Sequence, residues 1–113
     1  MLQWNYLTRE DQLQLIKEKS FTRPQVLFKH STRCGTSSIA LSRLDKAVKT
    51  PGADFHFLDL IRHRNISNQV AEDFKVHHES PQVLLIKNGE CVYEESHLGI
   101  IPDELFEQID TGQ

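Results

Sequence analysis

The chain has 113 residues, with 13 basic and 16 acidic side chains and a net charge of −3. Its length fits one compact domain over residues 1–113, and its charge provides no basic surface for nucleic acid and no cationic face for anionic lipid. The N-terminus has no secretory-signal pattern and no segment is apolar for long enough to cross a membrane, which predicts a cytoplasmic protein.

Helix and strand patterns alternate through the first two thirds of the chain. Acidic residues after Thr8 are typical of a helix start, whereas short β-branched and aromatic runs are typical of buried strands. Apolar residues that recur three and four positions apart predict the other helices. The expected elements are a helix from about Thr8 to Lys19, a strand over 26–28, a helix from Gly35 whose apolar pattern runs to Val48 before Thr50-Pro51-Gly52 halts it, a strand over 55–60 and a helix capped by Ser67.

The last third contains two short apolar runs, 83–86 and 91–93, on either side of Asn88-Gly89. Asparagine and glycine tolerate positive φ, so this pair predicts a tight antiparallel hairpin, and Pro102 suits the first position of a closing helix. The order αβαβαββα with right-handed crossovers predicts an α/β protein with a mixed four-stranded sheet flanked by helices, which is the thioredoxin-like topology. The segment with Trp4 and Tyr6 is expected to pack over this sheet as a cover.

Cys34 is the candidate catalytic residue because it follows a predicted buried strand and opens a predicted helix. The free N–H groups and the dipole of a helix start favour the thiolate, which is the nucleophilic form of cysteine. The sequence 31–38 is polar, unlike the surroundings of a buried structural cysteine. The neighbours expected to stabilise the thiolate or bind substrate are His30, Arg33, Gly35, Thr36 and Ser37.

Ser80 and Pro81 are the second part of the expected site. Proline cannot donate a hydrogen bond to a sheet, so Pro81 marks the start of the strand over 83–86 or a sheet edge. The predicted topology brings this strand start beside Cys34, and we expect a cis Ser80-Pro81 bond there. Both residues are therefore predicted to bind substrate.

The six histidines do not form a metal-binding pattern. None makes an H-x-x-x-H pair on a predicted helix, and the adjacent His77 and His78 would point to opposite sides of an extended segment. We expect no bound metal. His78, which is close to Pro81 in sequence, has two interpretations, a residue at the border of the site or an exposed loop residue, of which the exposed loop residue is the more frequent, and the same holds for His97.

Three segments together resemble a known family: Phe28-Lys29-His30-Ser31-Thr32-Arg33-Cys34, His78-Glu79-Ser80-Pro81-Gln82-Val83-Leu84-Leu85 and Ser96-His97. In this order and spacing they resemble the YtxJ family of monothiol bacilliredoxins, thioredoxin-like proteins of low-GC Gram-positive bacteria. The family usually has proline and isoleucine after the cysteine, where this chain has Gly35 and Thr36.

The resemblance implies removal of bacillithiol from S-bacillithiolated client proteins, with bacillithiol as the low-molecular-weight co-substrate and no tightly bound cofactor. Cys34 would attack the mixed disulfide, release the client thiol and carry the bacillithiol until a small thiol or a reductase regenerates it. The identity of the clients, the recycling reductase, the reduction potential and the oligomeric state do not follow from the resemblance.

The run Cys34-Gly35-Thr36-Ser37 also resembles motifs of two other thioredoxin-fold groups. Glutaredoxin-linked arsenate reductases follow it with an arginine, where this chain has Ser38, and monothiol glutaredoxins have phenylalanine in place of Thr36. A further alternative is a non-enzymatic domain of the same fold that docks a partner through the surface of Cys34 and Pro81.

Cys91 is not expected to serve as a second redox cysteine. Residues 82–87, at about 3.3 Å each, carry the chain roughly 20 Å from Pro81 before the hairpin returns. A disulfide needs α-carbons within about 7 Å of each other. The sequence therefore predicts a monothiol cycle in which Cys91 is a passive strand residue.

Overall fold

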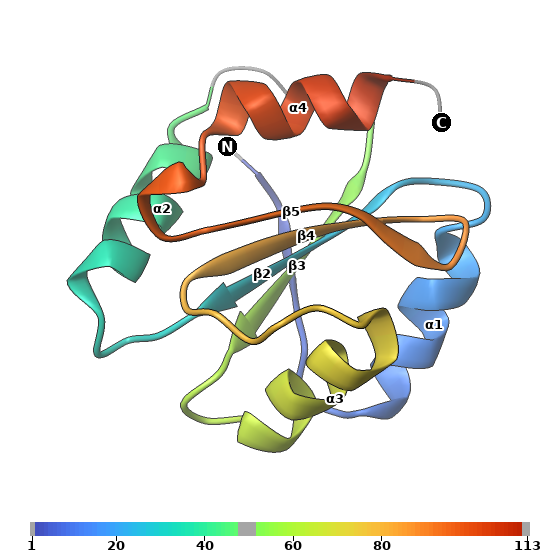
Figure 1. Ribbon diagram of the computed structural model, residues 1–113, viewed down its shortest axis with the longest axis horizontal. Coiled ribbons are helices and arrows are strands. Elements are labelled where there is room, and N and C mark those ends of the chain that lie inside the picture. The colour runs from blue at the N-terminus through green and yellow to red at the C-terminus, as the bar shows by residue number, and fades with distance from the viewer. Residues whose placement is uncertain (1, 48–51, 112–113) are drawn as a thin grey trace.

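The computed structural model describes residues 2–47 and 52–111 and contains a mixed sheet with helices on both faces (Figure 1). The strand order is β1-β3-β2-β4-β5, in which β1, β3 and β2 are parallel and β4 and β5 are antiparallel to their neighbours. The elements are β1 (Trp4–Tyr6), α1 (Asp11–Lys19), β2 (Gln25–His30), α2 (Gly35–Asp45), β3 (Asp54–Asp59), α3 (Arg64–Phe74), β4 (Gln82–Lys87), β5 (Glu90–Ser96), a short 3-10 helix η1 (His97–Gly99) and α4 (Pro102–Asp110).

The thioredoxin-like fold class is confirmed, and each face of the sheet is covered by one pair of helices (Figure 1). Apolar residues of α2 and α4 pack on one face and those of α1 and α3 pack on the other. The predicted positions Val48, Thr50 and Pro51 lie outside the described residues. No helix within the described ranges is both long and apolar enough to span a bilayer.

The prediction of four strands is wrong, because residues 4–6 form a fifth strand at the edge of the sheet. Trp4 pairs with Phe55 in parallel register, and its indole contacts the rings of Phe55 and Phe57 edge-on. The indole Nε1 also donates a hydrogen bond of 2.8 Å to Asp45 Oδ1 at the end of α2. A strand this short has too few residues to show an alternating pattern, so only its pairing with β3 identifies it.

Two predicted helix caps are also wrong. The first helix begins at Asp11 rather than Thr8, because the side chain of Gln12 accepts hydrogen bonds from the backbone N–H groups of Thr8 and Arg9 and holds them outside the helix. In α3, Ser67 is a fully buried residue of the first turns, since the helix already begins at Arg64. A turn over residues 59–63, held partly by the Asp59 carboxylate, starts this helix earlier.

The predicted hairpin and closing helix are confirmed. Asn88 and Gly89 have φ values of 53° and 80°, as the two central residues of a tight hairpin turn require. A Cβ at Gly89 would lie 3.0 Å from the ring of Phe21, so both conformation and space favour glycine there. Pro102 occupies the start of α4.

His56 is a buried polar residue at the centre of β3 that links folding to pH. Its Nε2–H donates to Gln25 Oε1 at 2.7 Å, and the Gln25 amide donates in turn to the Asp54 carboxylate at 2.8 Å. Burial lowers the pKa of His56 to about 4, and the Asp54 carboxylate opposes this shift only in part. His56 is therefore neutral in the folded protein at pH 7.

This lowered pKa predicts a loss of stability in mild acid. Below the ordinary value of 6.5 the unfolded chain binds the proton first, so the free energy of unfolding falls from pH 6.5 down to about pH 4. Between pH 8 and pH 5, His56 is expected to lower the free energy of unfolding by about 2 kcal/mol. Urea unfolding of wild type and His56→Gln at both pH values measures it. Equal losses in the two proteins would contradict the assignment.

Candidate active site

Cys34 lies four residues beyond the end of β2 and is the residue that precedes the first turn of α2. Its backbone is extended, with φ −118° and ψ 119°, and its carbonyl accepts the first helical hydrogen bond, from Ser38 N, at 3.2 Å. Its own N–H donates to Ser31 O at 3.2 Å, which fixes the turn between strand and helix. The side chain is half-buried and makes no capping hydrogen bond, although Cys34 occupies the position that precedes the free N–H groups of the helix start.

His30 and Ser37 lie beneath this turn and are buried. The Ser37 hydroxyl oxygen is 2.8 Å from His30 Nδ1 and accepts a hydrogen bond of 3.0 Å from Ser31 N. Burial lowers the pKa of His30, with the Asp59 carboxylate opposing the shift. His30 is therefore uncharged near pH 7, and its contact with Ser37 helps to fix the turn that precedes α2.

The other predicted neighbours of the thiol are at the surface. Arg33 is exposed, and its N–H donates to Ser31 Oγ at 3.3 Å. Gly35 is exposed, and apart from its chain neighbours and the nearby helix backbone a Cβ there would meet no described atom within 4 Å. Thr36 is half-buried. Among the described residues, neither the Thr36 nor the Ser37 hydroxyl makes a hydrogen bond to the Cys34 sulfur.

The segment before β4 carries the predicted proline, and the Ser80-Pro81 bond is cis, as expected. The antiparallel register pairs Gln82 with Lys29, so Pro81 lies at the end of β2 from which the chain turns toward Cys34. Pro81 O accepts a hydrogen bond of 3.0 Å from the His97 N–H in η1. The two predicted parts of the site therefore lie at the same end of the paired strands β2 and β4.

Two candidates beneath this segment, Lys29 and His78, were not among the predicted site residues, although the closeness of His78 to Pro81 in sequence had suggested that His78 borders the site. The Lys29 side chain is fully buried, and its Nζ donates to His78 Nδ1 at 3.0 Å. Ser67 Oγ of α3 lies 3.4 Å from the same nitrogen. His78 is half-buried rather than the exposed loop residue expected from the sequence. The sequence does contain one indication of this pair, because Lys29 is a charged residue that directly continues the apolar strand residues 26–28.

Glu79 lies between two histidines at the surface of the same segment. Its carboxylate is 3.7 Å from His77 Nε2 and 3.3 Å from His97 Nε2. The His97 side chain is 53% exposed, which agrees with the expected exposed histidine. In the part of the chain that the structure describes, no group of three or more His, Cys, Asp or Glu residues could hold a metal ion.

Cys91 lies at the start of β5, far from Cys34. It pairs with Ile86, which pairs with Gln25 at the beginning of β2, whereas Cys34 follows the end of β2. Five strand residues at about 3.3 Å each separate those ends by roughly 16 Å, beyond the 7 Å or so that a disulfide allows. Burial raises the pKa of the Cys91 thiol to about 11, and its Sγ–H donates to Tyr93 O at 3.4 Å.

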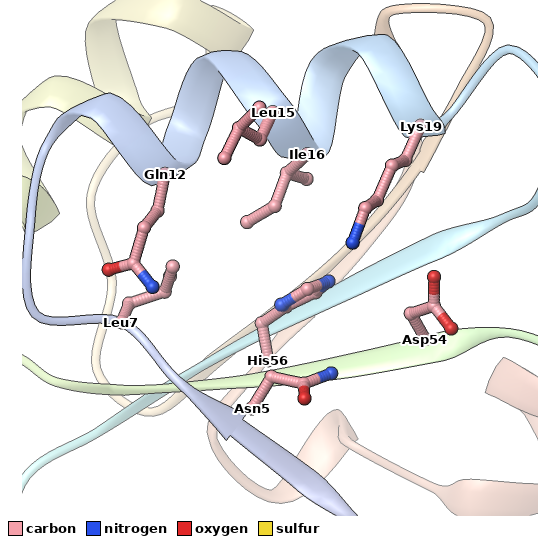
Figure 2. A pocket seen from close by; sticks show the side chains of 8 residues that line it. All are labelled: Asn5, Leu7, Gln12, Leu15, Ile16, Lys19, Asp54 and His56. Carbon is pink, nitrogen blue, oxygen red and sulfur yellow. The ribbon is translucent and has the colours of Figure 1, made fainter.

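A separate hollow of about 380 Å³ lies between α1 and the strands β1 and β3 (Figure 2). His56 forms part of its floor and Lys19 reaches over it from the end of α1. Asp54, at one end of the hollow, begins β3, and β3 is parallel to β2. The hollow therefore extends toward the end of the sheet opposite to Cys34.

The cysteine at a helix start after a central strand, together with a cis proline before an antiparallel hairpin, defines a thioredoxin-fold thiol protein. A solved structure described as a candidate oxidoreductase with a thioredoxin fold has a TM-score of 0.79 and 28% identity, and the match covers 90% of this chain and 89% of that chain. Thioredoxins of Malassezia sympodialis and Fasciola hepatica each have a TM-score of 0.71, with 19% and 20% identity. These matches cover 96% of this chain and 90% and 99% of theirs, and they show the fold.

The family itself follows from the sequence of the whole domain. Residues 5–105 match the family described as monothiol bacilliredoxin BrxC, and the chain belongs to this family. The match confirms the resemblance to monothiol bacilliredoxins, and its bounds include Cys34, Pro81 and Cys91.

Proposed function

We propose that the protein is a cytoplasmic thiol-disulfide oxidoreductase that removes bacillithiol from S-bacillithiolated proteins through Cys34. The Cys34 thiolate attacks the bacillithiol sulfur of the mixed disulfide, and the client thiolate leaves and takes a proton. The product is a disulfide between Cys34 and bacillithiol. A low-molecular-weight thiol then attacks the bacillithiol sulfur and leaves with it as a disulfide, or a reductase supplies two electrons and frees bacillithiol, and either route regenerates Cys34.

One observation carries the proposal: Cys34 stands alone at the helix start, beside Pro81, with Cys91 at the other end of the sheet. A second thiol within reach would close an internal disulfide and release bacillithiol at once. Because the chain has two cysteines in all, the bacillithiol adduct on Cys34 is expected to persist until an external thiol arrives. Membership of the monothiol bacilliredoxin family supports the same cycle.

The test compares two mixed disulfides of one client protein, one with bacillithiol and one with glutathione. The reduced protein is mixed with each, and the rate of client thiol release and the mass of the Cys34 peptide are measured. We expect faster release and a Cys34 adduct with bacillithiol. A preference for glutathione would favour the glutaredoxin-like alternative, and no release from either client would favour a non-enzymatic docking domain.

A further inference from the structure

Two lysines are buried in the central strands, at opposite ends of the sheet. Lys29 in β2 is fully buried and Lys87 in β4 is 4% exposed. Burying an ammonium group costs several kcal/mol unless hydrogen bonds and charges compensate, so each lysine needs partners. Lys87 Nζ donates to Gln108 O of α4 at 2.9 Å, whereas Lys29 Nζ donates to His78 in the segment before β4.

Side chains of the sheet form hydrogen bonds with two successive residues of the segment 77–81, His77 and His78. Lys29 and Gln82 are directly paired across β2 and β4. Lys29 binds the ring of His78 at 3.0 Å, and the Gln82 side-chain amide donates to His77 O at 2.9 Å. An ammonium has no lone pair, so His78 Nδ1 is the acceptor of the first bond. This pair therefore fixes the chain just before Ser80-Pro81.

The lysine is poorly explained by stability alone. A buried charge adds little net stability, because the cost of removing it from water offsets most of what its contacts contribute. Burial also lowers the pKa of Lys29 to about 8, and the Glu79 carboxylate opposes this shift only in part, so the position disfavours the charged form. What the lysine contributes is the contact to His78, and through it the position of the proline.

We propose that Lys29 is a positioning residue for the reaction of Cys34, which holds the Ser80-Pro81 segment through His78 where the client's mixed disulfide docks. The inference rests on the proposed function and adds to it a residue that positions the docking segment, whereas Cys34 supplies the nucleophile. An extended client segment would pair with the main chain beside Pro81. A displaced segment weakens docking and leaves the thiol itself unchanged.

The test uses Lys29→Met, with Lys87→Met as the matched control. Both variants remove a buried ammonium and one hydrogen bond from the same sheet, but only the first touches residues 77–81. For Lys29→Met we expect KM for the bacillithiolated client to rise about tenfold, as the loss of one charge-assisted hydrogen bond allows. The kcat and the rate of Cys34 alkylation by iodoacetamide should stay within about twofold of wild type.

A second readout does not depend on turnover. The His97 amide donates to Pro81 O, so its hydrogen exchange reports whether the proline segment stays in place. We expect this amide to exchange at least about tenfold faster in Lys29→Met and at the wild-type rate in Lys87→Met. If even the wild type releases no client thiol, the proposed function fails, and the exchange rates still confirm or overturn the anchoring by Lys29.

The pH profile separates the charge of Lys29 from its bulk. Lys29 contacts His78, pairs with Gln82 of β4 and interacts with the Glu79 carboxylate. His78 in turn lies near Ser67 of α3 and interacts with Arg64 and His77. Dividing kcat/KM by the alkylation rate removes the ionisation of Cys34 itself. This ratio should fall above about pH 8 in wild type, as Lys29 loses its proton, and stay level in Lys29→Arg. An unchanged KM in Lys29→Met, or an equal rise in Lys87→Met, would overturn the proposal.

Discussion

Replacement of Cys34 by serine is expected to reduce release of the client thiol to the uncatalysed rate without weakening the fold. A serine hydroxyl remains protonated at neutral pH and does not displace a thiolate from a disulfide, so the nucleophile is lost. The side chain makes no capping hydrogen bond in the native structure, and serine is a preferred residue at this position of a helix. Thermal unfolding should therefore occur at the wild-type temperature or slightly above it.

Cys91→Ala is the control for this experiment. It removes the other thiol at the far end of the sheet and should leave the rate of release within about twofold of wild type, because the substitution is distant from the site. Turnover that survives in Cys34→Ser, or that disappears in Cys91→Ala, would contradict the assignment of Cys34 as the nucleophile.

The two thiols should also differ by a large factor in chemical reactivity. Burial raises the pKa of Cys91 from 9.0 to about 11, so its thiolate fraction near pH 8 is about 100-fold below that of an unburied cysteine. Because alkylation proceeds through the thiolate, iodoacetamide at pH 8 should modify Cys34 while Cys91 stays free. Peptide masses taken during the reaction measure both rates.

The same reaction in urea supplies its control. Once the chain unfolds, Cys91 loses the burial that raises its pKa and should react about as fast as a cysteine in a short peptide. Comparable rates for Cys34 and Cys91 in the folded protein would contradict the burial of Cys91 and weaken the case for a monothiol cycle.

Features that depend on residues adjacent in sequence were sufficient to predict most of the fold and the positions of Cys34 and Pro81. The position of Cys34 after a strand and before a helix, the Asn88-Gly89 turn and the proline at the start of β4 each depend on residues adjacent in sequence. Such features follow from dihedral preferences and hydrogen-bonding capacity alone. The family match supports the same assignment of elements over most of the chain.

Features made by residues far apart in the sequence were missed. The strand containing Trp4 exists because it pairs with Phe55, and its three residues carry no period of their own. Lys29 and His78 meet only because β2 and β4 lie side by side, so His78 looked like an ordinary surface histidine. His30 and Ser37 are close in sequence, but their burial, which makes the pair structural, depends on the packing of α2 on the sheet.

The most direct test of the account is a single turnover by Cys91→Ala, followed by intact mass. The reduced variant is mixed with one equivalent of a bacillithiolated client in the absence of any recycling thiol. We predict that the mass of one bacillithiol group leaves the client and appears on the variant, on the peptide that contains Cys34. Free bacillithiol in solution with no adduct on Cys34, or a stable disulfide between the variant and the client, would contradict a cycle in which Cys34 alone accepts the bacillithiol.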